Sequence, residues 1–152
     1  MSRIDHHRSV AHHAGLRFAG YAALFDKVDA GRDLIKKGAF LRSLAELRMS
    51  DQRLALLWQH RCDQRVGWIE RICEDERGLR VIGCIDHAAS RAARLVKTGG
   101  LSGLSFGYRA RHADMAVLGD GRQGRALHCV DLFEVSLVSR PMQHGSRIHC
   151  VS

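Results

Sequence analysis

The sequence predicts a β-rich α+β fold, a small closed or nearly closed β-barrel of about seven strands with helices packed outside it. Three observations lead to this prediction. The chain has 152 residues, close to the usual size of one domain. Most apolar segments are short and end at polar, glycine-containing turns, as the strands of hairpins do. Helical features are confined to two segments that lie between predicted strands, which argues against a doubly wound parallel sheet.

Two strands and a helix are predicted in the first third of the chain. Residues 16–24 (LRFAGYAAL) have the composition of a strand, and residues 33–35 form a short extended segment after a polar turn. A helix begins at residues 38–40, because apolar side chains then recur at helical spacing, at Phe40, Leu41, Leu44 and Leu47.

The middle of the chain predicts three more strands. Residues 54–58 (LALLW) are continuously apolar and too few for a helix, which is typical of a strand buried on both faces. Residues 66–72 and 79–85 flank the polar segment 74–78, which ends in glycine. Two apolar segments on either side of such a turn indicate a β-hairpin.

A second helix and the final strands follow. Ser90 is a suitable N-cap for a helix over residues 90–98, and the glycine pair 99–100 would end it. Residues 104–108 and the longer segment 126–138 are predicted strands. The polar segment between them, residues 109–124, is predicted to be mostly loop.

Composition excludes several classes of protein. Hydrophobic residues make up 45% and charged residues 26%, which fits neither a disordered chain nor a membrane protein. We expect no contact with a membrane and no export, since neither a spanning segment nor an apolar leader is present. The net charge of +8 would attract acidic partners. Without a long basic run or many aromatic residues, we expect nucleic acid to bind only non-specifically.

The cysteines and histidines bear on compartment and metal binding. An odd number of widely spaced cysteines predicts reduced, mostly buried thiols in a cytoplasmic setting. No CxxC pair occurs, which argues against a structural zinc site, and we expect neither a metal nor another cofactor. Paired histidines lie within residues 1–15, which we interpret as a flexible, solvated tail, with a metal-binding tail as the alternative. The predicted domain covers residues 16–148, and residues 149–152 form a second tail.

Ser105 lies in a strand with two unlike faces. Alternation places Leu104, Phe106 and Tyr108 on one face, and Gly103, Ser105 and Gly107 on the other. A hydroxyl between two glycines is open to close approach by another backbone, as a peptide substrate of a serine nucleophile requires. The same pattern also fits a barrel strand with small residues at a tight bend.

His60 follows the buried segment 54–58 and is expected at the rim of the barrel. A neutral imidazole there could accept the proton of a serine hydroxyl near neutral pH. It could equally form hydrogen bonds that cap the end of the strand.

Glu134 is a candidate acid in the segment 126–138. Strict alternation places it on the same face as Val130, Leu132 and Val138, and a carboxylate among apolar side chains must be paired. It could orient a catalytic histidine or form a structural pair with an arginine. Asp131, on the other face, and His128, on the face of Glu134, are the alternative candidates.

Four segments, in order along the chain, resemble the prohead maturation proteases of tailed bacteriophages, the caudovirus prohead serine protease family. The resemblance covers residues 16–148. The first segment consists of FAGYA (residues 18–22) and DLIKKGAF (33–40), and the second of LWQH (57–60) with VG (66–67) and ERGL (76–79). The third is GLSGLSFGY (100–108), and the fourth is DLFEVSLV (131–138) followed by Pro141.

The resemblance implies a serine endopeptidase on a barrel similar to that of the herpesvirus assemblins. Its substrates would be the scaffold, or the scaffold-like N-terminal segment of the major capsid protein, and the enzyme itself. It would act inside the assembling procapsid in the cytoplasm of the bacterial host. Apart from the resemblance, the chain could form a homodimer or a larger oligomer.

Residue by residue, the resemblance implies Ser105 as nucleophile and His60 as general base and acid. Glu134 is the expected third member, with Asp131 and His128 as alternates, and Ser102 is a weaker candidate nucleophile. Two further hypotheses remain. One is a non-catalytic barrel that binds capsid or scaffold protein as an assembly factor, and the other is a basic barrel that binds nucleic acid.

Overall fold

The computed structural model describes residues 14–152, so most of the predicted N-terminal tail lies outside the described residues. Eight strands form one sheet in the order β2-β7-β3-β4-β5-β1-β8, with β6 paired to β7. The elements are β1 (Leu16–Leu24), β2 (Asp33–Ile35), α1 (Leu41–Met49), β3 (Ala55–Trp58), β4 (Arg61–Glu74), β5 (Gly78–Ile85), α2 (Arg91–Thr98), β6 (Gly103–Val117), β7 (Gln123–Val138) and β8 (Ile148–Val151). The predicted β-rich barrel with two helices is confirmed.

The C-terminal segment brings the two ends of the curled sheet together. The carbonyl of Arg147 accepts from the N–H of Tyr21 on β1 at 3.1 Å, and the carbonyl of Ser146 accepts from the N–H of Leu104 on β6 at 2.9 Å. Strand β8 then pairs with β1. Residues 149–152, predicted to be a tail, therefore contribute a strand, and the barrel is nearly closed.

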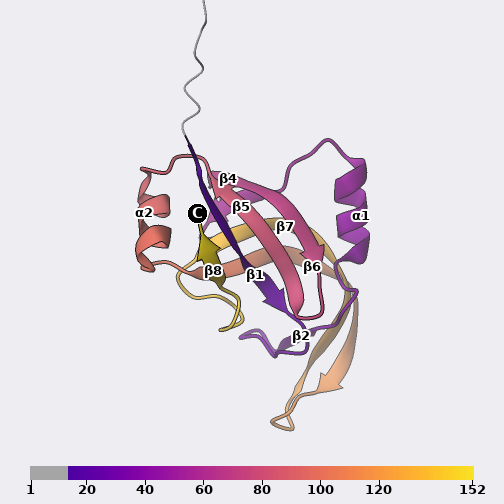
Figure 1. The fold of residues 1–152 in the computed structure, drawn as a ribbon. Helices are drawn as coiled ribbons and strands as arrows, with labels where there is room; N and C mark the ends of the chain where they lie inside the picture. The colour runs from indigo at the N-terminus through magenta and orange to yellow at the C-terminus, as the bar shows by residue number, and fades with distance from the viewer. Residues whose placement is uncertain (1–13) are drawn as a thin grey trace, which may run out of the picture.

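The core lies inside the curled sheet. Alternate side chains of the strands point inward, and the helices add Phe40 and Leu44 from the α1 region and Ala93 and Val96 from α2 to the same core. Figure 1 shows α1 and α2 on opposite sides of the sheet. None of the helices among residues 14–152 is long and apolar enough to span a membrane.

The two helices begin and end for different local reasons. The hydroxyl of Ser90 accepts from the N–H of Ala93 and caps α2, and Gly99 ends that helix in the left-handed conformation, as predicted. Phe40 provides no side-chain cap for α1. Instead, the carboxylate of Glu74 on β4 accepts from the N–H groups of Gly38 and Phe40, both at 2.9 Å. These two hydrogen bonds connect the start of helix α1 to the end of β4.

Strands β6 and β7 continue well beyond the barrel as a two-stranded hairpin, which Figure 1 shows projecting from the body. The prediction of a loop over residues 109–124 is wrong, because β6 reaches Val117 and β7 begins at Gln123. Both faces of this ribbon are largely solvated, since the successive residues Asp114 and Met115, which point to opposite faces, are both exposed. Its sequence therefore lacks the alternation of a half-buried strand.

The five cysteines are free thiols, but the expectation that most of them are buried is wrong. Cys62, Cys73 and Cys150 are exposed, whereas Cys84 and Cys129 are partly exposed. All five lie on strands of the barrel wall or of the hairpin.

Candidate active site

The turn between β3 and β4 positions His60. Trp58 pairs with Arg61, so the turn consists only of Gln59 and His60, and both adopt left-handed backbone conformations with φ of 49° and 59°. A two-residue hairpin turn of this kind normally prefers Asn or Gly. The sequence thus places a histidine where the backbone conformation is unfavourable, at the end of β3 and next to the end of β7.

The imidazole of His60 is hydrogen-bonded to Glu134 on β7. The distance from Nδ1 to Oε1 is 2.6 Å. Because a carboxylate oxygen only accepts, Nδ1 carries the proton and Nε2 of the neutral ring is left with a free lone pair. The hydrogen bond to Glu134 raises the pKa of His60 above its usual 6.5, and burial opposes this rise only in part. The His60 side chain is 41% exposed and open to a substrate.

Ser105 lies on the strand next to Glu134. In the antiparallel β6–β7 pair, Ser105 is opposite Ser136 and Gly107 is opposite Glu134. Side chains that are directly opposite project to the same face, with Cβ atoms about 5 Å apart. The backbone N–H of His60 in turn donates to Ser136 Oγ at 3.1 Å. The structure therefore brings the three predicted site residues together on one outer face of the barrel.

The hydroxyl of Ser105 is nearly buried, with the residue 3% exposed. Within residues 14–152 this hydroxyl has no hydrogen-bond partner. Its hydrogen-bonding capacity is therefore not taken up by another group in this part of the chain. A serine–histidine hydrogen bond, which is often looser in unliganded hydrolases, is not made here.

The glycines beside Ser105 do not leave the open strip that alternation suggested. A Cβ at Gly103 would lie 2.3 Å from the carbonyl oxygen of Val138 and 3.0 Å from Cδ of Pro141. A Cβ at Gly107 would lie 2.5 Å from Oε1 of Glu134. The space is thus filled by the protein itself, and Gly107 makes room for the acid rather than for a peptide.

A β-bulge at Phe133 corrects the predicted face of Glu134. Gly107 pairs with Glu134, but Tyr108 pairs with Leu132, so Phe133 has no partner and the alternation of β7 is reversed. Leu132 therefore packs against the core, whereas Glu134 lies on the outer face with Ser136. Asp131, predicted on the opposite face, shares the outer face with Glu134.

Residues 4–152 match the family model described as caudovirus prohead serine protease. The chain belongs to the caudovirus prohead serine protease family. It is 30% identical over 135 residues to the prohead protease of Enterobacteria phage HK97, covering 86% of this chain and 58% of that protein. The resemblance predicted from four segments is confirmed.

The barrel of this prohead protease family member is similar to those of herpesvirus proteases. The structure of the varicella-zoster virus protease matches with a TM-score of 0.58 and 19% identity, covering 91% of this chain and 64% of that one. The KSHV protease in complex with a hexapeptide phosphonate inhibitor matches with a TM-score of 0.50 and 17% identity, covering 91% and 65%. At such identities the likeness concerns the fold alone, and the predicted assemblin-like fold is confirmed. The chain spans less than two thirds of each of these proteins.

The alternative site residues of this prohead protease family member have other partners. Asp131 accepts from Arg109 at 2.9 Å and from Arg111 at 2.5 Å. The hydrogen bond from Arg111 is the main reason why the pKa of Asp131 is lowered. His128 pairs with Asp114 at 3.1 Å. Neither residue contacts His60.

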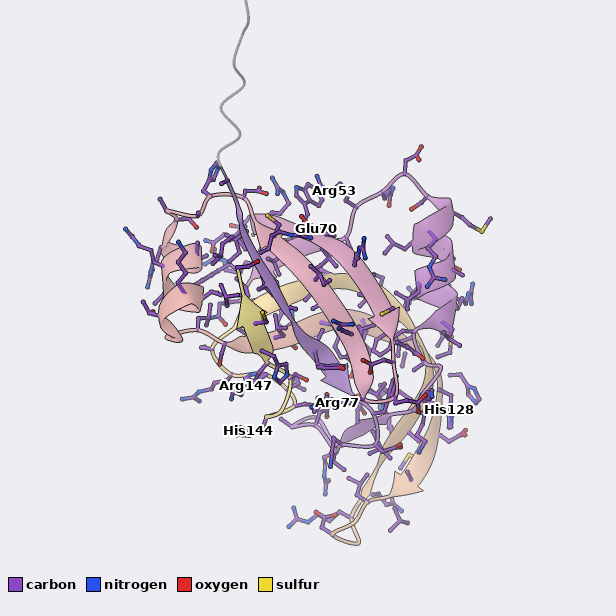
Figure 2. All side chains as sticks on the ribbon, viewed as in Figure 1. Arg53, Glu70, Arg77, His128, His144 and Arg147 are labelled. Carbon is purple, nitrogen blue, oxygen red and sulfur yellow. The ribbon has the colours of Figure 1, made fainter. Side chains whose placement is uncertain are left out.

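Two of the remaining candidates lie on different sides of the molecule. Ser102 accepts a hydrogen bond from the side chain of Arg147 at 2.9 Å. The backbone of Arg147 forms an isolated antiparallel β-bridge with that of Gly103 at the start of β6. Figure 2 shows His128 across the molecule from Arg147. His128 is therefore remote from the start of the strand that carries Ser105.

Sequence reasoning missed Ser136 and Gln59. Ser136 is fully buried and donates to Oε2 of Glu134 at 2.6 Å. Gln59 exchanges hydrogen bonds with Ser139 at the end of β7. The spacing of two between Glu134 and Ser136 is a signal that could have placed both on one face. Nothing in the sequence signals a left-handed turn at Gln59.

Proposed function

We propose that this chain is a serine endopeptidase of phage head maturation, with Ser105 as nucleophile, His60 as general base and acid, and Glu134 as the acid that orients His60. The observation that carries the proposal is the 2.6 Å hydrogen bond between His60 Nδ1 and Glu134 Oε1, made on the face of the barrel that also carries Ser105. This hydrogen bond fixes the tautomer that a base needs. Membership of the prohead protease family supports the same activity.

In the proposed reaction, His60 Nε2 removes the proton of Ser105 as Oγ attacks the scissile carbonyl. The resulting imidazolium is stabilised by Glu134 and donates its proton to the leaving amine. A water molecule, again deprotonated by His60, then hydrolyses the acyl-enzyme. No step requires a metal ion or an organic cofactor.

The proposed substrates are the scaffold or the scaffold-like N-terminal segment of the major capsid protein, together with the enzyme itself. The proposed place of action is the interior of the assembling procapsid. The prohead protease of phage HK97, by its name and its identity of 30% over 135 residues, supports this setting.

The test is co-expression of the chain with the capsid protein of its own gene cluster, with the capsid N-terminus read by mass spectrometry. We expect a shortened capsid protein with the natural chain. With Ser105→Ala we expect no shortening, because loss of a serine nucleophile lowers kcat by roughly 10⁶. Ser102→Ala is the matched control, since Ser102 is a nearby serine whose hydroxyl binds Arg147.

A fluorophosphonate probe gives a second, direct measurement. We expect it to label Ser105 in the natural chain and in Ser102→Ala, but not in Ser105→Ala. Capsid cleavage by folded Ser105→Ala would contradict the proposal. Capsid binding without cleavage or labelling would instead favour the assembly-factor hypothesis.

A further inference from the structure

Ser136 connects the two residues of the His60–Glu134 pair through a single hydroxyl. Its O–H donates to Oε2 of Glu134 at 2.6 Å, the carboxylate oxygen that His60 does not use. Its lone pair accepts the backbone N–H of His60 at 3.1 Å. The residue is completely buried, so water does not compete for these hydrogen bonds.

The turn that carries His60 needs such contacts because its backbone is strained. Gln59 and His60 are consecutive non-glycine residues at positive φ. Three contacts with the end of β7 hold them there. The N–H of Gln59 donates to the carbonyl of Leu137 at 2.9 Å, the side-chain amide of Gln59 exchanges hydrogen bonds with Ser139, and the N–H of His60 binds Ser136.

We propose that Ser136 is a positioning residue, which fixes the carboxylate of Glu134 and the backbone of His60 relative to each other and so sets the direction in which the imidazole faces Ser105. This inference rests on the proposed function for its catalytic consequence, but the arrangement it describes can be measured without catalysis.

The geometry explains why one hydroxyl has this effect. A glutamate side chain held only through Oε1 can turn about its terminal bonds, whereas one held at both oxygens cannot. Within residues 14–152, Glu134 is the only charged side chain that forms a hydrogen bond or an ion pair with the His60 side chain. If Ser136 is removed, the hydrogen bond that raises the pKa of His60 weakens, and the N–H of His60 loses its partner.

The first experiment measures the histidine directly. His60 is titrated by NMR through its ring resonances in the Ser105→Ala chain, which has no proposed activity, with and without Ser136→Ala. We expect Ser136→Ala to lower the pKa of His60 toward its usual value and to broaden the Nδ1–H signal.

Ser43→Ala is the matched control. Ser43 is also buried, and its hydroxyl likewise donates one hydrogen bond and accepts one, but both are with the backbone of β7: it donates to the carbonyl of Val130 at 2.9 Å and accepts from the N–H of Leu132 at 3.0 Å. Loss of its hydroxyl should lower the melting temperature without changing the titration of His60.

The second experiment measures cleavage. With Ser105 intact, we expect Ser136→Ala to lower kcat by up to about 100-fold, the effect of misplacing a catalytic group by about 1 Å, with little change in KM. The acidic limb of the kcat/KM profile should move to lower pH. Ser136→Cys, which keeps the size of the side chain and a weak donor, should give an intermediate result.

An unchanged His60 titration in folded Ser136→Ala or Ser136→Cys would overturn the inference, as would an equal shift in Ser43→Ala. If the natural chain cleaves no protein, the proposed function fails, but the titration still decides whether Ser136 positions the pair.

Discussion

Gly107 lies opposite Glu134, and a single added methyl group there should separate the acid from His60. A Cβ at this position would lie 2.5 Å from Oε1, the oxygen bound by His60 Nδ1, and 3.0 Å from Cγ. Ordinary contact begins near 3.4 Å, so the carboxylate must move by about 0.9 Å. A displacement of that size costs up to about 100-fold in rate. We therefore expect Gly107→Ala to lower kcat/KM about 100-fold.

The assay is the rate of capsid-protein cleavage by purified protein, with the melting temperature measured in parallel. The atoms in conflict belong to a side chain rather than to backbone, so the barrel should fold. Gly119→Ala at the hairpin tip is the control, because nothing lies within 4 Å of its added Cβ and activity should be unchanged. A folded Gly107→Ala chain with kcat/KM within about threefold of the natural chain would refute the reasoning.

Three further predictions follow from the paired carboxylates. Glu134→Gln should lower kcat/KM by as much as about 10⁴-fold and move its acidic limb to lower pH, as a pH–rate profile can show, because the hydrogen bond that raises the pKa of His60 is weakened. The His60–Glu134 pair should stabilise the fold fully below pH 6.5 and lose this effect as the pH rises through the raised pKa of His60. Urea unfolding of the natural chain and Glu134→Gln should therefore differ more at pH 6, where the imidazolium and the carboxylate are both charged, than at pH 9. Asp33→Asn should lower the free energy of unfolding by about 2–3 kcal/mol in the same assay. Asp33 is buried and binds Arg125 through both oxygens, but the Arg125 side chain is 49% exposed, so the cost falls short of that for a fully buried pair.

Much of the fold is predictable because its signals are local. Ser90 and Gly99 delimit α2 by capping, and the apolar segments of the barrel wall alternate or are continuously apolar as buried strands require. The projecting hairpin was missed because residues 109–124 are solvated on both faces. Strand β8 was missed because its residues are mostly exposed and pair only with β1.

The site is less predictable, since it depends on departures from regular geometry. Alternation correctly placed Ser105 opposite the bulky face of its strand, but the glycines beside it face the protein's own atoms. The left-handed turn at Gln59 and His60 has no sequence signature, because neither residue is one that such a turn prefers. The contacts that hold it come from β7, far away in the chain.

The bulge at Phe133 shows why the choice of acid requires a structure. By reversing the alternation of β7, it brings Asp131 and Glu134 to the same face, so position alone does not distinguish them. Their partners do. Asp131 is engaged by two guanidinium groups, which hold its pKa below the usual range, whereas Glu134 contacts an imidazole and a hydroxyl. A carboxylate already neutralised by arginines has little charge left to stabilise an imidazolium, and of these two carboxylates Glu134 is therefore the one we propose as the partner of His60.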